Sequence, residues 1–366
     1  MSQLTCGFVG LGLIGGSIAR ALKEHYPHTV VIAYDPNREA LEIARKDGVV
    51  NVAAPGIDES FFGCDYLFLC APVQRNDDNL EAVKRVLSAD CILTDVGSVK
   101  TGIHEAIRRA GLESRFIGGH PMAGSERIGY VNSKTSLLEN TYYILTPSKA
   151  VPEEKVDAFK QLVAGLGAIP LVLDYSWHDY VTAAISHLPH VIASSLVNLI
   201  CDSDSADGIM RTVAAGGFKD ITRIASSSPV MWQQICLANA DNISALLDDY
   251  IRGLKDFKAA IDSHSADILY QNFDHARAYR DSFANASSGP IKRSYSMNVD
   301  IADRPGALAH IVTLLAEKNL SIKNISISHN RESEDGVLRV EFYQESSLTE
   351  GTNLLREAGY SVHIHS

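Results

Sequence analysis

Residues 118–126 read GGHPMAGSE and place an imidazole directly after a pair of glycines. The short apolar run Phe116-Ile117 comes before them and predicts the end of a strand. Because glycine allows sharp turns, we expect His120 to lie in a loop beside a sheet. Histidine titrates near neutral pH, so His120 is a candidate acid or base for moving a proton. Taken alone, it could equally be a packing residue.

A glycine-rich loop near the start of the chain is a second chemical signature. Residues 6–16 read CGFVGLGLIGG, a short strand followed by a helix that starts near Ser17. Gly10 would make the tight turn, Gly12 would let the backbone approach a pyrophosphate, and Gly15 would let helix and strand pack closely. These glycines, with Leu13 and Ile14 at the positive end of the helix dipole, form the predicted phosphate loop.

An acidic residue follows this loop at the spacing that dinucleotide sites require. The next apolar run, residues 30–34, ends in Asp35, twenty residues after Gly15. A carboxylate there accepts hydrogen bonds from the ribose hydroxyls and repels a 2′-phosphate, so we predict NAD rather than NADP. Arg38 could soften that preference, although a solvated arginine at a helix start is the simpler interpretation.

Strand-like and helix-like segments alternate through the first half of the chain. The strand 66–70 is followed by Ala71 and Pro72. The strand 91–96 is followed by Ser98, and the strand 115–117 by His120. This alternation predicts a doubly wound parallel sheet of the Rossmann type, an α/β fold in which ligands bind beyond the carboxyl ends of the strands. Ala71, Pro72, Ser98 and His120 would then lie on the cofactor's side. Ser98 is equally a candidate N-cap of the next helix.

From about Tyr175 the strand pattern stops, and an all-helical domain is predicted. Its helices are residues 179–199, 209–215, 230–252 and 254 to about 282. Their broad apolar faces predict packing against a second subunit. Within it, His187 and His190 are three residues apart, but no third metal ligand is evident nearby, so a substrate-contacting or structural histidine is favoured over a metal site.

Two cations follow a glycine pair in the segment GGFKDITR, residues 216–223. Lys219 and Arg223 are four positions apart, on one face of a predicted helix. Arginine suits bidentate capture of a carboxylate, whereas a surface ion pair with Asp220 is the alternative. Trp232 begins the next helix and would either wall a pocket or pack in the core.

The composition excludes several classes of partner. The chain has 366 residues, 46% of them hydrophobic, and a formal net charge of −11, which argues against nucleic acid or an anionic membrane. Six scattered cysteines without a CxxC pair predict buried reduced thiols. No signal-like start and no apolar run near 20 residues is evident, so we expect a cytoplasmic protein.

The segment after the linker at 287–290 alternates short strands and helices. It runs as strand 295–301, helix 307–318, strands 321–329 and 337–343, helix 348–358 and strand 360–365. That βαββαβ order predicts a ferredoxin-like domain. We therefore expect three parts, at residues 1–174, 175–286 and 294–366.

Five motifs in order resemble the prephenate/arogenate dehydrogenase family (TyrA). They are GLGLIGGS, DVGSVK, GGHPMAGSE, SHLPH and GGFKDITRIASSSPVMW, and the resemblance covers about residues 4–290. It implies that NAD takes a hydride from the ring of prephenate while the ring carboxylate leaves as carbon dioxide, giving 4-hydroxyphenylpyruvate. The alternatives are arogenate as substrate, a 3-hydroxyacid dehydrogenase, or a sensor of NAD and amino acids without activity.

The resemblance also implies a role for each candidate residue. His120 would bind the ring hydroxyl, and Ser98 would orient His120 or the nicotinamide. His190 would contact the substrate, Arg223 would bind one of its carboxylates, and Trp232 would line the pocket. Glu126, Lys219 and Asp220 would form an ionic group at the pocket mouth.

The tail resembles an ACT domain, with DRPGAL at residues 303–308 matching the first turn of that family. The resemblance implies side-by-side pairing, hence a homodimer or larger homo-oligomer, and an amino-acid effector with tyrosine as the candidate. The implied effector residues are Arg304, Pro305, Gly306, Ala307 and Asn324. A dimerising module without a ligand is the alternative.

Overall fold

The computed structural model describes the chain except residues 1–2, 72, 125–126, 284–294, 303, 305, 330–334 and 365–366. The side chains of 73–78, 327–329 and 335 are also outside the description. The chain forms two compact units, Met1–His264 and Ser265–Ser366. Pro72, Ser125, Glu126 and Pro305, which the sequence analysis singled out, lie outside the described residues.

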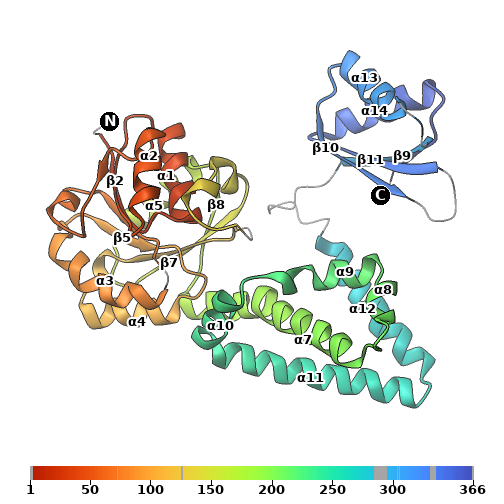
Figure 1. Ribbon diagram of the computed structural model, residues 1–366, viewed down its shortest axis with the longest axis horizontal. Coiled ribbons are helices and arrows are strands. Elements are labelled where there is room, and N and C mark those ends of the chain that lie inside the picture. The colour runs from red at the N-terminus through yellow and green to blue at the C-terminus, as the bar shows by residue number, and fades with distance from the viewer. Residues whose placement is uncertain are drawn as a thin grey trace. The chain divides into compact units, whose positions relative to one another are not determined.

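The first unit begins with a five-stranded parallel sheet (Figure 1). Its strands are β1 (Thr5–Val9), β2 (Val30–Tyr34), β3 (Val52–Ala53), β4 (Tyr66–Leu69) and β5 (Ile92–Asp95), in the order β3-β2-β1-β4-β5. The helices are α1 (Leu13–His25), α2 (Arg38–Lys46), α3 (Val73–Val86) and α4 (Thr101–Ala110). This confirms the predicted doubly wound sheet.

Two separate apolar cores cover the two faces of this sheet. One contains Ile18 of α1 and Leu41 of α2, together with Phe159 of α5 (Glu153–Gly165). The other contains Val83 of α3 and Ile107 of α4. Because both faces are covered, strands such as Tyr66–Leu69 are apolar almost throughout, as expected of a buried parallel sheet.

A second, three-stranded sheet continues beyond β5 and carries His120. It comprises β6 (Ile117–Pro121), β7 (Tyr142–Pro147) and β8 (Ile169–Val172), and an isolated bridge from Leu93 to Phe116 joins it to β5. The pair β6–β7 is antiparallel, unlike the strands before it. Among the described residues of the connection, the regular structure is limited to the short 3-10 turns Tyr130–Asn132 and Thr135–Leu137, and antiparallel neighbours need no crossover helix.

Helices make up the rest of the first unit. They are α6 (Tyr175–Thr182), a π-helix (Ala183–His187), α7 (Leu188–Ser203), α8 (Ile209–Val213), α9 (Gly216–Thr222), a 3-10 turn (Arg223–Ser226), α10 (Pro229–Ala238) and α11 (Ala240–Asp262). The predicted single helix 230–252 is wrong, because Asn239 breaks it. Ile185, Leu199, Leu237 and Leu254 are exposed apolar residues on these helices.

Two expectations from composition need correction. The continuous helical stretch Tyr175–Ser203 has 29 residues and a mean hydropathy of 1.4, so by length and composition it passes the test for a membrane span. A single helix of this kind is weak evidence for a membrane span, because core helices of soluble proteins have the same length and composition, and the first turns of this one carry the buried polar pair His178 and Asp179. Of the six cysteines, Cys201 is exposed, while Cys6, Cys64 and Cys91 are buried and unpaired.

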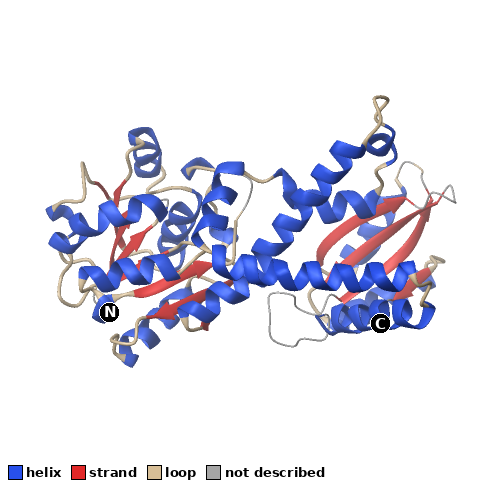
Figure 2. Cartoon of the chain, turned by 90° about the horizontal axis from the view of Figure 1, so that it is seen from below, coloured by secondary structure: helices blue, strands red, loops and turns tan. Residues whose placement is uncertain are grey.

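The second unit contains α12 (Ala266–Ser282) and a four-stranded sheet (Figure 2). Its strands and helices follow as β9 (Tyr295–Ala302), α13 (Ala307–Glu317), β10 (Ile322–His329), β11 (Asp335–Phe342), α14 (Glu345–Glu357) and β12 (Val362–Ile364). The sheet order is β10-β11-β9-β12, and Val299, Ile311 and Leu355 lie in its core. The predicted βαββαβ order is confirmed, whereas the predicted helix from 254 to 282 ends at Asp262 and restarts at Ala266.

Candidate active site

The glycine loop between β1 and α1 has the backbone that the sequence predicts. Gly10 has φ +96°, and a Cβ there would lie 2.8 Å from the amide nitrogen of Ala71. A Cβ on Gly15 would lie 2.8 Å from the carbonyl oxygen of Gly10. Gly12, in contrast, has open space: no described heavy atom outside its own neighbourhood lies within 4 Å of the added Cβ. The uncapped start of α1, at Leu13 and Ile14, therefore has room for a phosphate group.

Asp35 follows β2 and lies beside this loop. Its carboxylate accepts hydrogen bonds from the amides of Leu11 and Asn37, both at 2.7 Å. Arg38 donates to the carbonyl oxygens of Ala54 and Pro55, at 2.9 and 2.5 Å, and lies over the Tyr34 ring. Arg38 is exposed at the start of helix α2, as the interpretation of a solvated arginine expects, and its guanidinium is also held by these two carbonyl groups.

His120 lies within strand β6, opposite Ile144 of β7, and the predicted loop location was wrong. The preceding glycines do not make a turn. They are needed because neighbours approach closely: a Cβ on Gly118 would collide with the Thr146 hydroxyl, and one on Gly119 would lie 2.5 Å from the carbonyl oxygen of Asp95. The glycine pair therefore lets β6 pack closely against Thr146 and Asp95, and this packing fixes the position of His120.

A chain of hydrogen bonds runs from His120 into helix α6. Nδ1 of His120 lies 2.8 Å from Nε2 of His178, whose Nδ1 lies 2.8 Å from Oδ1 of Asp179. Asp179 also accepts hydrogen bonds from the amides of Lys100 and Thr101, both at 2.7 Å, and from the Thr101 hydroxyl at 2.6 Å. Asp179 thus caps helix α4 from a distant part of the chain.

This capping corrects the expectation for Ser98. The N-cap position of α4 is Lys100, whose own side chain makes no cap bond, so Ser98 is not the N-cap. Ser98 lies half-buried between β5 and α4, after the strand end as predicted.

The hydrogen-bond chain fixes the tautomers of both histidines. Burial raises the pKa of Asp179, but the bonds from His178, Thr101 and Lys100 outweigh it and lower that pKa overall. The carboxylate accepts the proton of His178 Nδ1, so Nε2 of His178 accepts from Nδ1 of His120. Burial, with His178, Lys100 and His187 nearby, keeps the pKa of His120 well below its usual value. Neutral His120 therefore has a lone pair on Nε2.

A buried ion pair holds the backbone next to His120. Lys100 and Asp95 are fully buried, and the Lys100 ammonium contacts the Asp95 carboxylate. Lys100 donates to the carbonyl oxygen of Gly119 at 2.7 Å, while Asp95 accepts from the amide of Gly119 at 3.1 Å. The Lys100–Asp95 ion pair therefore holds both the amide and the carbonyl group of Gly119, the residue before His120.

A second group of side chains surrounds Trp232. The His190 ring stacks on Trp232, with centroids 3.6 Å apart, and its Nδ1 donates to the Ser186 carbonyl at 2.9 Å. The His187 ring packs edge-on against the same indole, with the ring centroids 5.9 Å apart. Burial lowers the pKa of His190, and the guanidinium of Arg223 lowers it further, which puts that cation near His190. A groove of about 470 Å³ extends from His190 and Trp232 along α7 and α10.

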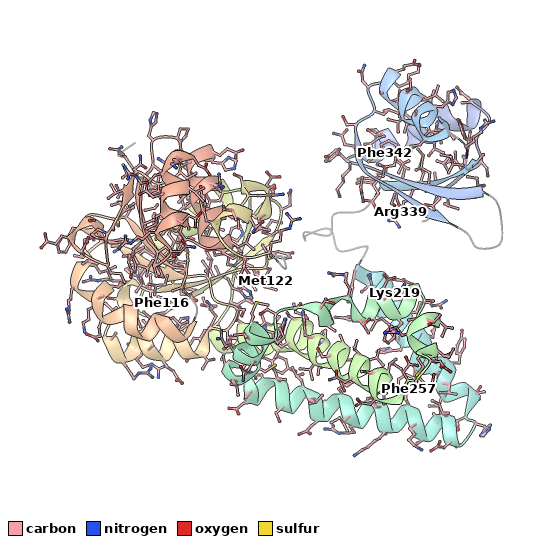
Figure 3. The ribbon with its side chains drawn as sticks, viewed as in Figure 1. Phe116, Met122, Lys219, Phe257, Arg339 and Phe342 are labelled. Carbon is pink, nitrogen blue, oxygen red and sulfur yellow. The ribbon has the colours of Figure 1, made fainter. Side chains whose placement is uncertain are left out.

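The remaining charged candidates are more scattered. Arg223 begins a 3-10 turn after α9 ends at Thr222, so it does not share one continuous α-helical face with Lys219. Lys219 and Asp220 are exposed. In Figure 3, Lys219 lies well apart from Met122, which follows the strand of His120. The structure thus brings His190, Arg223 and Trp232 together but leaves Lys219 away from His120.

Comparison with known proteins identifies the family. Residues 18–171 match "Prephenate dehydrogenase, nucleotide-binding domain", residues 174–275 match "Prephenate dehydrogenase, dimerization domain", and residues 295–362 match "ACT domain". A prephenate dehydrogenase of Bacillus subtilis is 37% identical over 94% of each chain. The chain belongs to the prephenate dehydrogenase family. It is therefore an oxidoreductase that uses NAD, in agreement with its glycine loop and Asp35.

Solved structures agree with this membership of the prephenate dehydrogenase family. Prephenate dehydrogenase from A. aeolicus, in complex with hydroxyphenyl propionate and NAD+, is 30% identical, with a TM-score of 0.72 over 77% of this chain and 99% of that one. Synechocystis arogenate dehydrogenase is 28% identical, with a TM-score of 0.70 over 76% of this chain and all of that one.

Within this member of the prephenate dehydrogenase family, sequence reasoning missed four residues that build the site: His178, Asp179, Lys100 and Asn239. Asn239 is buried and donates from Nδ2 to the carbonyl oxygen of Asp179 at 2.8 Å. Lys100 is the last residue of the motif DVGSVK, and that motif is the sequence signal for it. The sequence carries no local signal for His178, Asp179 and Asn239, because the residues that they bind in the folded protein are tens of positions away in the chain.

Proposed function

We propose that the chain catalyses the NAD-dependent oxidative decarboxylation of prephenate to 4-hydroxyphenylpyruvate. The observation that carries this proposal is the neutral imidazole of His120, oriented by His178 and Asp179, in a protein of the prephenate dehydrogenase family. Such a group can take a proton from a ring hydroxyl, and aromatisation of the ring favours the loss of carbon dioxide.

The residues of the first sheet fit NAD. Gly10, Gly12 and Gly15, with the amides of Leu13 and Ile14, would hold the pyrophosphate, and Asp35 would bind the ribose. Ala71, Pro72 and Ser98, which follow β4 and β5 in the chain, would line the rest of the site. When bound, NAD accepts the hydride from the ring carbon.

His120 performs the proton chemistry in this proposal. Nε2 accepts the proton of the ring hydroxyl as the carbon beneath it is oxidised, and the hydroxyl oxygen becomes a carbonyl oxygen. Loss of the ring carboxylate as carbon dioxide then places an electron pair on that oxygen, which takes the proton back from His120. Asp179 stabilises the transient imidazolium through His178. Ser98 is proposed to orient His120 or the nicotinamide.

The substrate is a dianion and needs fixed positive charge. Arg223, near His190, is proposed to bind a substrate carboxylate, with His190 and Trp232 forming the wall of the pocket. Lys219, Asp220 and Glu126 are proposed to form the ionic group at the pocket mouth. Because Lys219 lies apart from the strand of His120, its contribution would come through assembly of the predicted homodimer.

Arogenate is the second candidate substrate, since a structural relative acts as an arogenate dehydrogenase. Comparing kcat/KM for purified prephenate and arogenate tests the choice. We expect prephenate to be preferred by at least about tenfold, corresponding to about 1.4 kcal/mol in the transition state. A preference for arogenate would replace the proposed substrate, and inactivity toward both would favour a sensor.

The second unit is proposed to bind tyrosine as a feedback inhibitor. Gly306, with φ +87°, precedes α13 and sits next to Arg304 and Ala307, while Asn324 lies at a register shift in β10. The amide of Ala307 donates to the carbonyl oxygen of Arg304 at 3.2 Å. The resemblance to ACT domains extends the proposed contacts to Pro305.

A further inference from the structure

The carboxylate of Asp95, at the end of β5, binds two backbone amides from different parts of the chain. Its Oδ2 accepts a hydrogen bond from the amide of Gly97 at 2.9 Å, and its Oδ1 accepts one from the amide of Gly119 at 3.1 Å. Gly97 is the residue before Ser98, and Gly119 is the residue before His120. One carboxylate therefore holds the chain directly in front of both residues that the proposed function places at the reacting ring.

The connection between β5 and β6 depends on this side chain near the site. Earlier in the chain, the two segments are joined by an isolated bridge between Leu93 and Phe116. At Gly119 the two backbones approach so closely that a Cβ there would lie 2.5 Å from the carbonyl oxygen of Asp95. Gly119 is buried, and a buried amide without a partner is costly. The Asp95 carboxylate supplies the partner that this close approach requires.

Lys100 connects the Asp95 carboxylate to the rest of the site. Its ammonium contacts Oδ2 of Asp95 and donates to the carbonyl oxygen of Gly119 at 2.7 Å, and both charged side chains are buried. The backbone amide of Lys100 donates to Oδ1 of Asp179 at 2.7 Å. Asp179 is the last member of the hydrogen-bond chain that orients His120. The same lysine therefore contacts both the backbone before His120 and the group that orients its ring.

We propose that Asp95, with Lys100 as its counter-ion, is a positioning residue that fixes Ser98 and His120 relative to each other during the reaction. The hydride leaves one ring carbon, and His120 takes the proton from the oxygen on that carbon, so both groups must keep one geometry. A carboxylate suits this role because each of its two oxygens accepts an amide and neither can become a donor while it is ionised. This inference rests on the proposed function, because it concerns the ring of prephenate.

Asp95→Asn keeps the shape of the side chain but leaves one acceptor oxygen. The Lys100 ammonium and the Gly97 amide both favour that oxygen at the Oδ2 position. The new amide nitrogen then faces the amide of Gly119, donor against donor, and displaces the chain before His120. We expect kcat for prephenate to fall by at least about tenfold, with KM for prephenate and for NAD within about threefold of the wild type. Unchanged kcat, or a loss confined to KM, would overturn the proposal.

A double variant separates positioning from stability. Asp95→Asn alone leaves the buried ammonium of Lys100 without its carboxylate, which destabilises the fold. Asp95→Asn combined with Lys100→Met removes both charges, so its Tm should be higher than that of Asp95→Asn alone. We expect its kcat to stay at least about tenfold below the wild type, because the shared carboxylate is still missing. A kcat that recovers together with Tm would show a purely structural role, and the proposal would fail.

The matched control is Asp47→Asn, the same substitution at a carboxylate that also joins distant parts of the first unit. Asp47 follows α2 and accepts hydrogen bonds from Arg20 at 2.6 Å and from the Tyr130 hydroxyl at 3.0 Å. We expect this variant to lower Tm and to keep kcat close to that of the wild type. A loss of kcat as large as in Asp95→Asn would mean that losing any such carboxylate slows the reaction, which contradicts a specific role for Asp95.

Amide hydrogen exchange of the full chain without substrate examines the geometry independently of turnover. We expect the Gly119 amide to exchange at least about tenfold faster in Asp95→Asn than in the wild type, after normalisation to the amides of β1 in the same unit. The normalisation removes any change in global stability. Equal exchange at Gly119 in the two proteins would refute the inference. If exchange responds as expected but the wild type does not turn over prephenate, the proposed function has failed instead.

Discussion

Nε2 of His178, on helix α6, lies 2.8 Å from Nδ1 of His120, on strand β6. The two residues are 58 positions apart, and the bond joins the helical region to the sheet that follows the nucleotide-binding strands. The orientation of the proposed base therefore depends on how the helical region docks. Asp179 makes a second connection between the helical region and the nucleotide-binding part, because its carboxylate binds the first amides of α4.

The first prediction concerns the base itself. His120→Asn should retain NAD affinity, because the glycine loop and Asp35 are unchanged. Its kcat for prephenate should fall by about 10²-fold or more, since a positioned proton-accepting group is lost. Steady-state kinetics with NAD titration by fluorescence measures both. Full activity in this variant would rule out His120 as the base.

The second prediction concerns the positioning residue Asp179. Asp179→Asn should lower kcat by about 10²-fold while leaving KM for NAD unchanged, because His178 would no longer hold His120 in one tautomer. It should also lower Tm, because charge-assisted bonds to α4 worth about 1.5–3 kcal/mol each are weakened. A lower Tm with unchanged kcat would show that Asp179 has only a structural role. Asp174→Asn, at the exposed N-cap of α6, is the control.

The third prediction concerns pH and stability. His104 and His187 both have pKa values lowered by burial to about 4, against about 6.5 in the unfolded chain. Between these values the unfolded state binds more protons, so stability is fully present above pH 6.5 and decreases as pH falls toward 4. Each histidine contributes on the order of 3 kcal/mol to this loss. Tm should decrease over that range, less steeply in His104→Gln; a flat profile would contradict the assignment.

The fourth prediction concerns cofactor choice. Asp35→Ser removes the carboxylate that would repel a 2′-phosphate, while Arg38 remains nearby. The ratio of kcat/KM for NADP to that for NAD should rise by at least about tenfold, a change of about 1.4 kcal/mol. Arg38→Ala in the same background should reverse part of the gain. An unchanged ratio would remove Asp35 from the ribose site.

The fifth prediction concerns tyrosine. Arg304→Ala should raise the tyrosine concentration for half-inhibition by about tenfold while leaving kcat without tyrosine unchanged. Isothermal titration of tyrosine into the full chain measures the same affinity directly. Inhibition that is unchanged in Arg304→Ala and strictly competitive with prephenate would place the inhibitor in the active site instead.

The sequence was sufficient for the features that are local. The glycine spacing with Asp35, the βαββαβ order of the tail and the strand before His120 all follow from short-range patterns. The sequence predicts a turn at the glycines before His120, but the structure uses them for close contacts with Thr146 and Asp95, which belong to other strands that the local pattern cannot show. No pattern in the sequence shows where α6 docks.

The π-helix illustrates why register is hard to predict. In a regular α-helix, eight positions at about 100° each would leave His187 about 80° from Asp179 around the axis, and the π-helix Ala183–His187 changes that angle. Pro189 follows two residues later and signals an irregularity, because it has no N–H for the carbonyl of Ile185, but it does not show which register the helix takes. The break between α10 and α11 at Asn239 is equally hard to predict, because the side-chain amide of Asn239 bonds to Asp179 and His187 and forms no recognisable turn motif.

The cap that Asp179 places on α4 has a consequence for synthesis of the protein. The amides of Lys100 and Thr101 leave the ribosome 79 and 78 residues before the carboxylate that binds them. The nucleotide-binding strands therefore emerge while His120 still lacks its orienting partner. Catalytic competence has to wait until α6 has been translated, so a chain that stalls before residue 179 could bind a nucleotide without consuming it.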